Sequence, residues 1–402
     1  MGSYSFFAER PLEQYRKSDT GFLISVILLL GLGLFTLYFC SQSAAYRLKG
    51  DSFYFVKRQF VCAIVGIVGF IFLAMAPVDF IRKILPVIWV ATIFLCVLTL
   101  IPGLGIEKNG ARRWLRLPMG FTLQASEIVK FTLIMYLANF FDKQSSISVI
   151  EERNVGKGVF NLVMFCGLVI AEKDFSTTVF IFVFCCIFFA ICGMKCKWMI
   201  FVGFLAVVLG IYFVLSEEYR LERIISFLNP TEGLHDGNYQ AMASKRAISA
   251  GGFWGAGIGT SLVQSNRIPE VQADYIFASW AEAMGLVGII VYFCILGFFA
   301  WKGFKISLSC KDRFAAYTSL GFVAMIVCQS LVNCGVVCGG LPSTGIPLPF
   351  FSLGGSSIIV TLCMCGFVIN ASRLNSDEDI KESTESVVKN INESEYIDLS
   401  SI

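Results

Sequence analysis

The sequence predicts an all-α polytopic membrane protein with about ten transmembrane helices and a long extracytoplasmic loop before the eighth helix. Hydrophobic residues make up 56% of the 402 residues, and charged residues only 15%. The mean hydropathy of +0.72 is far too high for a soluble globular domain. Apolar runs bounded by polar segments are the second observation, because a helix needs about 20 such residues to cross a bilayer.

The first apolar run, residues 21–40, follows a polar N-terminal segment, residues 1–20. It has no small-residue cleavage site, so we expect an uncleaved membrane anchor. The further spans are expected at residues 60–76, 84–101, 123–141, 158–171, 175–193, 199–215, 275–300, 314–334 and 356–371. Together they predict a membrane domain over residues 21–373, followed by an acidic, disordered tail over residues 374–402.

The long loop covers residues 216–272. A loop of this length is usually functional or disordered, and its aromatic and glycine residues argue against disorder. Residues 237–249 within it have the pattern of a helix. We therefore expect this loop to contribute to a functional site.

The distribution of charge bears on both topology and ligands. The net charge is +3, yet residues 376–402 carry eight acidic residues and two lysines, so the rest of the chain stands at +9. A basic membrane protein suits anionic head groups or substrates, although loop lysines that only set topology need no substrate. With the long loop set aside, Lys and Arg number 15 on the side of the termini and 9 on the other. This asymmetry predicts cytoplasmic termini.

The cysteines do not resemble a metal or disulfide framework. There are 15, with no CxxC pattern, and most lie within apolar runs. They are interpreted as small packing residues. Cys334 and Cys338 are the one pair with the position to form a bridge.

Polar clusters from separate spans fall on the predicted outer side. They are Arg112 to Trp114, Gln124 to Lys130, Glu172 to Asp174, the loop that ends at Asp274, and Pro342 to Ser357. A transport path would need polar residues through both halves of the membrane, and the inner halves of these spans are almost bare. The convergence therefore favours a catalytic or binding site on the outer face.

Asp274 precedes a strongly apolar helix. At a helix N-terminus the macrodipole favours the carboxylate, and a carboxylate at the lipid–water boundary is a reasonable general base for an alcohol. The alternative is that Asp274 only caps the helix. Glu282 lies about two turns deeper and is interpreted as a supporting residue.

The remaining candidates each have a functional and a structural reading. Arg112 and Arg113 suit a pyrophosphate, or anchor lipid head groups with Trp114 at the interface. Glu127 and Lys130 share one helical face and can neutralise each other. The glycines of residues 251–259 allow the backbone to approach a phosphate or another helix. Residues 352–357 start a helix, where free N–H groups hold an anion or glycines ease a helix contact.

Seven motifs occur together in one order: GARRW at 110–114, QASE at 124–127 with Lys130, EKDFST at 172–177, YQ with Ser244 and Lys245, GAGIG at 255–259, PEVQADYIFA at 269–278, and TGIPLPFFSLGGSS at 344–357. In this order they resemble the SEDS family, the polymerases FtsW and RodA, over residues 20–373. The spacing between Gly257 and Glu270 is more similar to the division branch, FtsW, while TGIPLPF also occurs in the elongation branch.

The resemblance implies a peptidoglycan glycosyltransferase that polymerises lipid II at the outer face of the bacterial cytoplasmic membrane. It also implies an inverting enzyme with undecaprenyl pyrophosphate as the leaving group. It implies Asp274 as the catalytic residue. The implied substrate-binding residues are Arg112, Arg113, Gln124, Ser126, Glu127, Lys130, Asp174, Gln240, Ser244, Lys245, Gly257, Gly259, Pro269, Glu270, Pro347, Ser352, Gly354 and Gly355.

The implied partners are the lipid-linked glycan, a class B penicillin-binding transpeptidase and divisome proteins at the division site, with no nucleic acid. No cofactor is required by the resemblance, and a role for Mg²⁺ or Mn²⁺ stays open. The sequence departs from the family pattern at Gln272-Ala273, Ala281, Glu172-Lys173 and Leu353, where the family commonly has His-Thr, Glu, Gln-Pro and Tyr. Two other functions are left open: a lipid II flippase or transporter, and a non-catalytic scaffold of the wall-synthesis complex.

Overall fold

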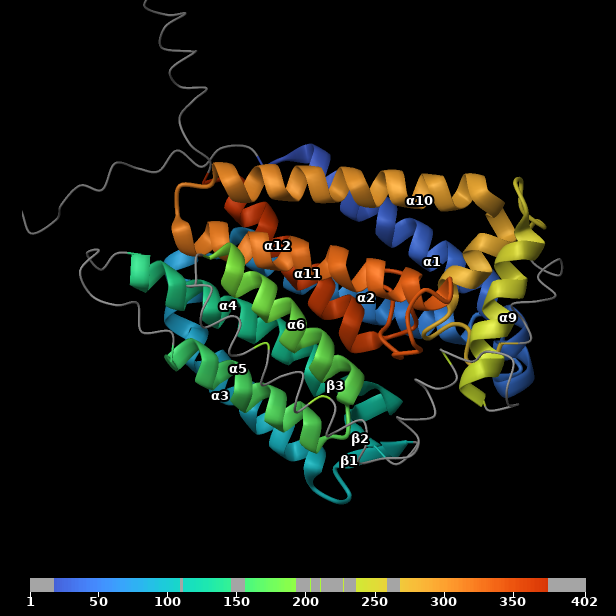
Figure 1. Cartoon of the computed structure of the whole chain (residues 1–402), viewed down its shortest axis with the longest axis horizontal. Coiled ribbons are helices and arrows are strands. Elements are labelled where there is room, and N and C mark those ends of the chain that lie inside the picture. The colour runs from blue at the N-terminus through green and yellow to red at the C-terminus, as the bar shows by residue number, and fades with distance from the viewer. Residues whose placement is uncertain are drawn as a thin grey trace, which may run out of the picture.

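The computed structural model describes residues 18–108, 111–145, 156–192, 236–258 and 268–374, together with the isolated residues 203, 210 and 227. Its helices are α1 (Thr20–Lys49), α2 (Tyr54–Met75), α3 (Val78–Leu100), α4 (Ala125–Ser145), α5 (Gly156–Ala171), α6 (Phe175–Ile191), α9 (Asp236–Gly251), α10 (Ile276–Ser309), α11 (Arg313–Val337) and α12 (Gly355–Ser372). Most of them run side by side along one direction, and α9 lies across one end (Figure 1).

The predicted helical membrane fold is confirmed. Among the described helices, α1, α2, α3, α10, α11 and α12 are long and apolar enough to cross a membrane, and α5 and α6 are shorter apolar helices. The predicted spans over these residues, and the one that became α4, all coincide with helices. Apart from Gly203 and Gly210, the expected seventh span, residues 199–215, lies outside the described residues, as does the tail beyond Leu374.

A small antiparallel sheet stands between α3 and α4, where the sequence predicted no strand. Its order is β1 (Gly105–Lys108), β2 (Ala111–Arg116) and β3 (Thr122–Gln124). Trp114 pairs with Gln124 across β2 and β3. Strands this short are not stable alone, so the sheet depends on the helices beneath it. The all-α description is therefore incomplete at this point.

Contacts at one end of the bundle join residues that are far apart in the sequence. The Asp19 N–H donates to Ser372 Oγ at 3.1 Å, and Lys302 Nζ lies 3.3 Å from Asp19 Oδ2. Arg82 bridges Asp142 at 3.0 Å in the same region. The first and last described helices thus begin and end at the same end of the bundle. The sheet and α9 occupy the opposite end (Figure 1).

Helices α2 and α12 form a closely packed pair. A Cβ on Gly366 of α12 would overlap the Phe70 carbonyl of α2, so no other residue fits there. Asn370 Nδ2 donates to the carbonyls of Leu73 and Ala76 at 2.7 and 2.6 Å. At the other end, Gln59 Nε2 donates to Ser352 O at 3.0 Å. This pair fixes the start of α12 at the end of the bundle that carries the sheet.

Candidate functional site

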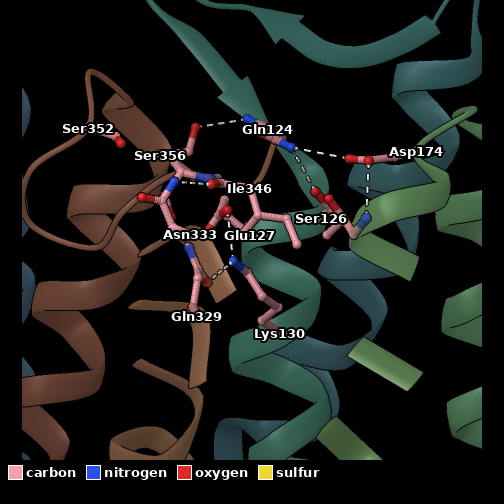
Figure 2. A network of polar contacts seen from close by, with 12 residues as sticks. Gln124, Ser126, Glu127, Lys130, Asp174, Gln329, Asn333, Ile346, Ser352 and Ser356 are labelled. Carbon is pink, nitrogen blue, oxygen red and sulfur yellow. Dashed lines mark hydrogen bonds and ion pairs between the residues drawn. The ribbon is translucent and has the colours of Figure 1, made fainter. Parts of the chain in front are cut away.

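The predicted outer clusters meet at the sheet end of the bundle. Gln124, at the end of β3, is the junction, because its N–H donates to Ser356 Oγ at 2.8 Å and its Nε2 donates to Asp174 Oδ2 at 3.3 Å. Its Nε2 also lies 3.0 Å from Ser126 Oγ. Figure 2 shows Gln124 lying between Ser356 and Asp174. Residues from β3, α4, α6 and α12 are therefore joined in one polar layer.

Asp174 joins this polar layer to a basic side chain of the sheet. It is the N-cap of α6, where its side chain accepts from the Thr177 N–H. Arg113 NH1 lies 3.4 Å from Asp174 Oδ1, and Arg113 NH2 donates to Lys173 O at 3.0 Å. The Asp174 side chain is 1% exposed. A buried carboxylate with a guanidinium and a helix N-terminus is strongly held.

The two adjacent arginines have different partners. Arg112 NH2 pairs with Glu107 Oε2 at 2.9 Å, and both side chains are exposed. Successive side chains of a strand point to opposite faces, so Arg112 does not join Arg113 at Asp174. The predicted arginine pair is thus divided between a surface ion pair and the buried layer.

A buried chain of polar contacts leads from α4 to α11. Lys130 Nζ lies 2.8 Å from Glu127 Oε1 and 2.6 Å from Gln329 Oε1. Glu127 and Lys130 are 3% and 2% exposed. Gln329 Nε2 donates to Pro347 O at 2.9 Å. Glu127 and Lys130 therefore do neutralise each other, as one reading of the sequence predicted, and they also support the loop that precedes α12 (Figure 2).

Asn333, one turn beyond Gln329 on α11, extends these polar contacts to Asp274. Its Nδ2 donates to Asp274 O and to Ile346 O, both at 2.8 Å. A Cβ on Gly345, which has φ 70°, would lie 3.4 Å from Asp274 Oδ2. The Asp274 carboxylate therefore faces the backbone of the loop 344–347, while Asn333 fixes its main chain.

Asp274 does not occupy the helix-capping position. The N-cap of α10 is Tyr275, and Asp274 is the residue before it. Its side chain is partly exposed, unlike those of Tyr275 and Ile276, which are buried. The catalytic role of Asp274 stays a prediction, because this position alone assigns no chemistry to the side chain. Glu282 is 1% exposed and lies deeper on α10, as expected of a supporting residue.

The glycine segment contacts another helix. The N–H groups of Ala256 and Gly257 donate to the carbonyls of Glu282 and Ala283 at 2.8 and 3.2 Å. Gly285 has φ 63° and breaks the helical geometry inside α10. A Cβ on Gly255 would overlap Ala283 O. The bend therefore holds the kink of α10, so the N–H of Gly257 is occupied by protein, while Gly259 lies outside the described residues.

The start of α12 is also occupied largely by protein contacts. The Leu353 N–H donates to Gln272 O at 2.8 Å, and the Gly354 N–H donates to Gln59 Oε1 at 3.2 Å. Ser352 Oγ accepts from the Leu348 N–H at 2.8 Å. A Cβ on Gly355 would lie 2.9 Å from Cys62 Sγ. These contacts favour the helix-contact reading of this motif and bring Gln272 next to α12.

The predicted residues of the long loop form a separate group on α9. Ser244 Oγ donates to Val337 O at 2.8 Å, and Gln240 Nε2 lies 3.4 Å from Pro269 O. Lys245 is exposed and lies against Gly339. Pro269 and Glu270 are exposed, and Glu270 has φ 49°. Through Ser244, this group packs on the end of α11.

Sequence reasoning missed Gln59, Gln329 and Asn333. Gln329 and Asn333 lie one turn apart on the same face of α11, within a run that was interpreted only as a membrane span. Two amides at this spacing in an apolar helix are the signal that would have found them. Gln59 precedes the apolar run of α2 and had no such pattern around it.

Two further expectations concern cysteines and metals. Cys334 and Cys338 are both free, so the bridge considered from the sequence is absent. Within the described ranges, no group of three or more His, Cys, Asp or Glu side chains has the arrangement of a metal site.

Asn333→Ala should lower activity far more than it lowers stability relative to a matched control. Asn370 is the control because it also donates to two main-chain carbonyls, but at the opposite end of the bundle. Each substitution leaves buried carbonyls without donors and should cost about 1–3 kcal/mol. The thermal unfolding temperature should fall by a similar amount in both variants. Only Asn333→Ala should also reduce turnover, by about tenfold or more. Equal activity losses in the two variants would contradict the positioning role.

Known proteins match almost the whole chain. Stage V sporulation protein E of Bacillus subtilis is 33% identical over 357 residues, which cover 88% of this chain and 97% of that protein. Probable peptidoglycan glycosyltransferase FtsW of Trichlorobacter lovleyi is 32% identical, covering 88% of this chain and 93% of that protein. The protein of the same name from Halothiobacillus neapolitanus is 34% identical, covering 90% and 88%.

Solved structures share the fold. A peptidoglycan synthase complex, described as coordinating polymerization and crosslinking, contains a chain with a TM-score of 0.72 and 24% identity, covering 90% of this chain and 99% of that one. Rod shape determining protein RodA of Thermus thermophilus gives a TM-score of 0.65 and 22% identity, covering 89% and 97%. The profile of the FtsW/RodA/SpoVE family, described as a cell cycle protein, matches residues 20–377. The chain is therefore a member of the FtsW/RodA/SpoVE family of integral membrane proteins.

Proposed function

We propose that this chain is a peptidoglycan glycosyltransferase that polymerises lipid II into glycan strands at the outer face of the cytoplasmic membrane. Relatives covering nearly the whole chain carry the name peptidoglycan glycosyltransferase FtsW. The observation that carries the proposal is the placement of Asp274. Asn333 fixes its main chain, and its carboxylate lies against the Gly345 backbone beside the polar layer.

In the proposed reaction, Asp274 accepts the proton of the acceptor sugar hydroxyl. The hydroxyl oxygen then attacks the anomeric carbon of the donor, the bond to the pyrophosphate breaks, and undecaprenyl pyrophosphate leaves. A single displacement inverts the anomeric configuration and needs one base, so a second catalytic carboxylate is unnecessary. The energy of the step comes from the pyrophosphate leaving group, so no cofactor is needed to supply it.

The basic sheet supports the leaving group in this proposal. Arg112 and Arg116 are more accessible than the buried residues of the polar layer, and guanidinium groups bind phosphate oxygens in a bidentate manner. Arg113 is already held by Asp174, so it orients the sheet and contributes charge. The buried Lys130 network supports the 344–347 loop and has no direct role in the chemistry.

Location and partners extend the proposal. The spacing between Gly257 and Glu270 favours the division branch of the family, so we place the chain at the division site. Both of its termini would then lie in the cytoplasm. A monofunctional class B transpeptidase would crosslink the strands that this chain makes, together with other divisome proteins. The similar chain in a synthase complex that joins polymerization to crosslinking supports such a pairing.

Proteoliposomes that contain fluorescent lipid II separate the proposed enzyme from its rivals. The purified chain should convert lipid II into glycan strands and release undecaprenyl pyrophosphate. A parallel assay should include the partner transpeptidase in an inactivated form. Deleting residues 376–402 should leave this activity intact, since the sequence predicts that the tail lies outside the membrane domain. Lipid II that crosses the bilayer without forming strands would identify a transporter, and a full-length chain that neither moves nor polymerises lipid II, even with its partner, would favour a scaffold.

A further inference from the structure

Glu172 is a buried carboxyl group that the proposed reaction does not use. It directly follows α5, and its side chain is 0% exposed. Thr99 Oγ1 on α3 donates to Glu172 Oε1 at 2.8 Å. Glu172 Oε2 is buried without a hydrogen-bond partner among the described residues. An ionised carboxylate in this environment would be poorly compensated, whereas a carboxylic acid avoids the cost of burying a charge.

The groups around Glu172 act on its charge in opposite directions. Thr99 and Cys96 face it from α3, Arg113 from β2, and Asp174 from the start of α6. Its own N–H donates to Leu168 O at 3.2 Å, so it lies at the C-terminal end of α5, where the helix dipole disfavours negative charge. Burial is the largest influence and raises the pKa of Glu172 to about 8, although Thr99, Cys96 and Arg113 lower it.

We propose that Glu172 is a positioning residue that works in its uncharged form, by leaving Asp174 as the one carboxylate that holds Arg113. Asp174 also accepts from Gln124, which is joined to Ser356 at the start of α12. Arg113 Nε is buried without a partner among the described residues, so this guanidinium has a donor to spare.

Ionisation of Glu172 would disturb this arrangement in two ways. A second carboxylate would compete with Asp174 for the Arg113 guanidinium, and it would repel the Asp174 carboxylate. Gln124 would then lose a well-placed acceptor, and the polar layer between the sheet and α12 would loosen. Activity should therefore fall as pH rises through the range in which Glu172 loses its proton.

The pH profile of polymerisation tests this role, and this readout rests on the proposed function. With a pKa of about 8, roughly one Glu172 in eleven keeps its proton at pH 9. Wild-type turnover should therefore fall to about a tenth between pH 7 and pH 9. Glu172→Gln keeps the shape without the charge and should retain its activity over this range. The same alkaline fall in Glu172→Gln would overturn the inference.

Thr99→Val gives a second test that does not require the glutamine variant to fold. Thr99 donates to Glu172 Oε1 and lowers its pKa. Removing that donor should move the alkaline fall in activity to higher pH, which general destabilisation would not do. An unchanged or lower midpoint would count against Glu172 as the titrating group.

Thermal stability tests the protonation state of Glu172 by a measurement that does not depend on enzymatic activity. The pKa of Glu172 rises from 4.5 to about 8 on folding, so its contribution to stability is complete below about 4.5 and is lost as pH rises to about 8. The Tm of the wild type, measured relative to Glu172→Gln, should fall over this window and then level off. A difference independent of pH would overturn the inference, even if no protein polymerised lipid II and the proposed function itself failed.

Discussion

Asp274→Asn should lower the rate of lipid II polymerisation by a factor of about 10²–10⁴, the usual contribution of a general base. Asparagine keeps the shape of the side chain and the main-chain carbonyl that accepts from Asn333. The thermal unfolding temperature should therefore change little. Initial rates of lipid II consumption and unfolding temperatures, measured on the same preparations, separate loss of chemistry from loss of fold.

Asp51→Asn is the matched control for this substitution. Asp51 precedes α2 at the same end of the bundle, where it forms an exposed ion pair with Lys57 at 2.8 Å. Solvent screens an exposed pair of this kind, so it adds little to stability, and this variant should keep wild-type activity. A similar loss of rate in both variants would mean that the Asp274 effect is not specific.

Lys130→Met should lower the free energy of unfolding by about 3–5 kcal/mol, because it leaves Glu127 buried without its cation. Lys130 and Glu127 lie 2.8 Å apart and are almost fully buried. Gln329 loses its partner as well, so the loop at Pro347 loses part of its support. Thermal unfolding in detergent measures the change, and the double variant with Glu127→Leu should recover part of the loss.

Lys57→Met provides the comparison, since Lys57 and Asp51 have the same 2.8 Å separation but are exposed. Its effect on the free energy of unfolding should be small, because solvent screens an exposed ion pair. If Lys130→Met were no more destabilising than Lys57→Met, the buried network would not be the support that the geometry indicates.

Helix positions were predictable because each apolar run must span the same hydrocarbon thickness. The residues at which the helices begin and end were less predictable. Helix α1 continues to Lys49 rather than ending near residue 40, since its polar last turns extend beyond the apolar run. Helix α3 begins at Val78, directly after Pro77, with Asp79 favourably placed in its first turn. Hydropathy does not detect such polar extensions.

The candidate site was predictable as a set of residues and not as a set of pairs. Clusters before and after each span had to share one end of the bundle, so their convergence followed from topology. The division between Arg112 and Arg113 depends on strand alternation in a sheet that the sequence analysis did not expect. The partners Gln329 and Asn333 belong to α11, and their contacts depend on how that helix is rotated against α4.

The glycine segment shows why local patterns left two readings open. Glycine allows the backbone to approach either a phosphate or another helix, and the sequence contains no information on which is present. The kink at Gly285 of α10 supplies the carbonyls that the segment binds. Helix geometry alone would have kept these carbonyls within α10, so the contact could not be foreseen.

Glycan-strand synthesis from lipid II by the purified chain, with and without the Asp274 carboxylate, tests the central claim most directly. The wild type should release one undecaprenyl pyrophosphate for each glycosidic bond that it forms, and Asp274→Asn should form almost none while keeping its fold. Strands formed at the wild-type rate by Asp274→Asn would contradict the assignment of Asp274 as the base.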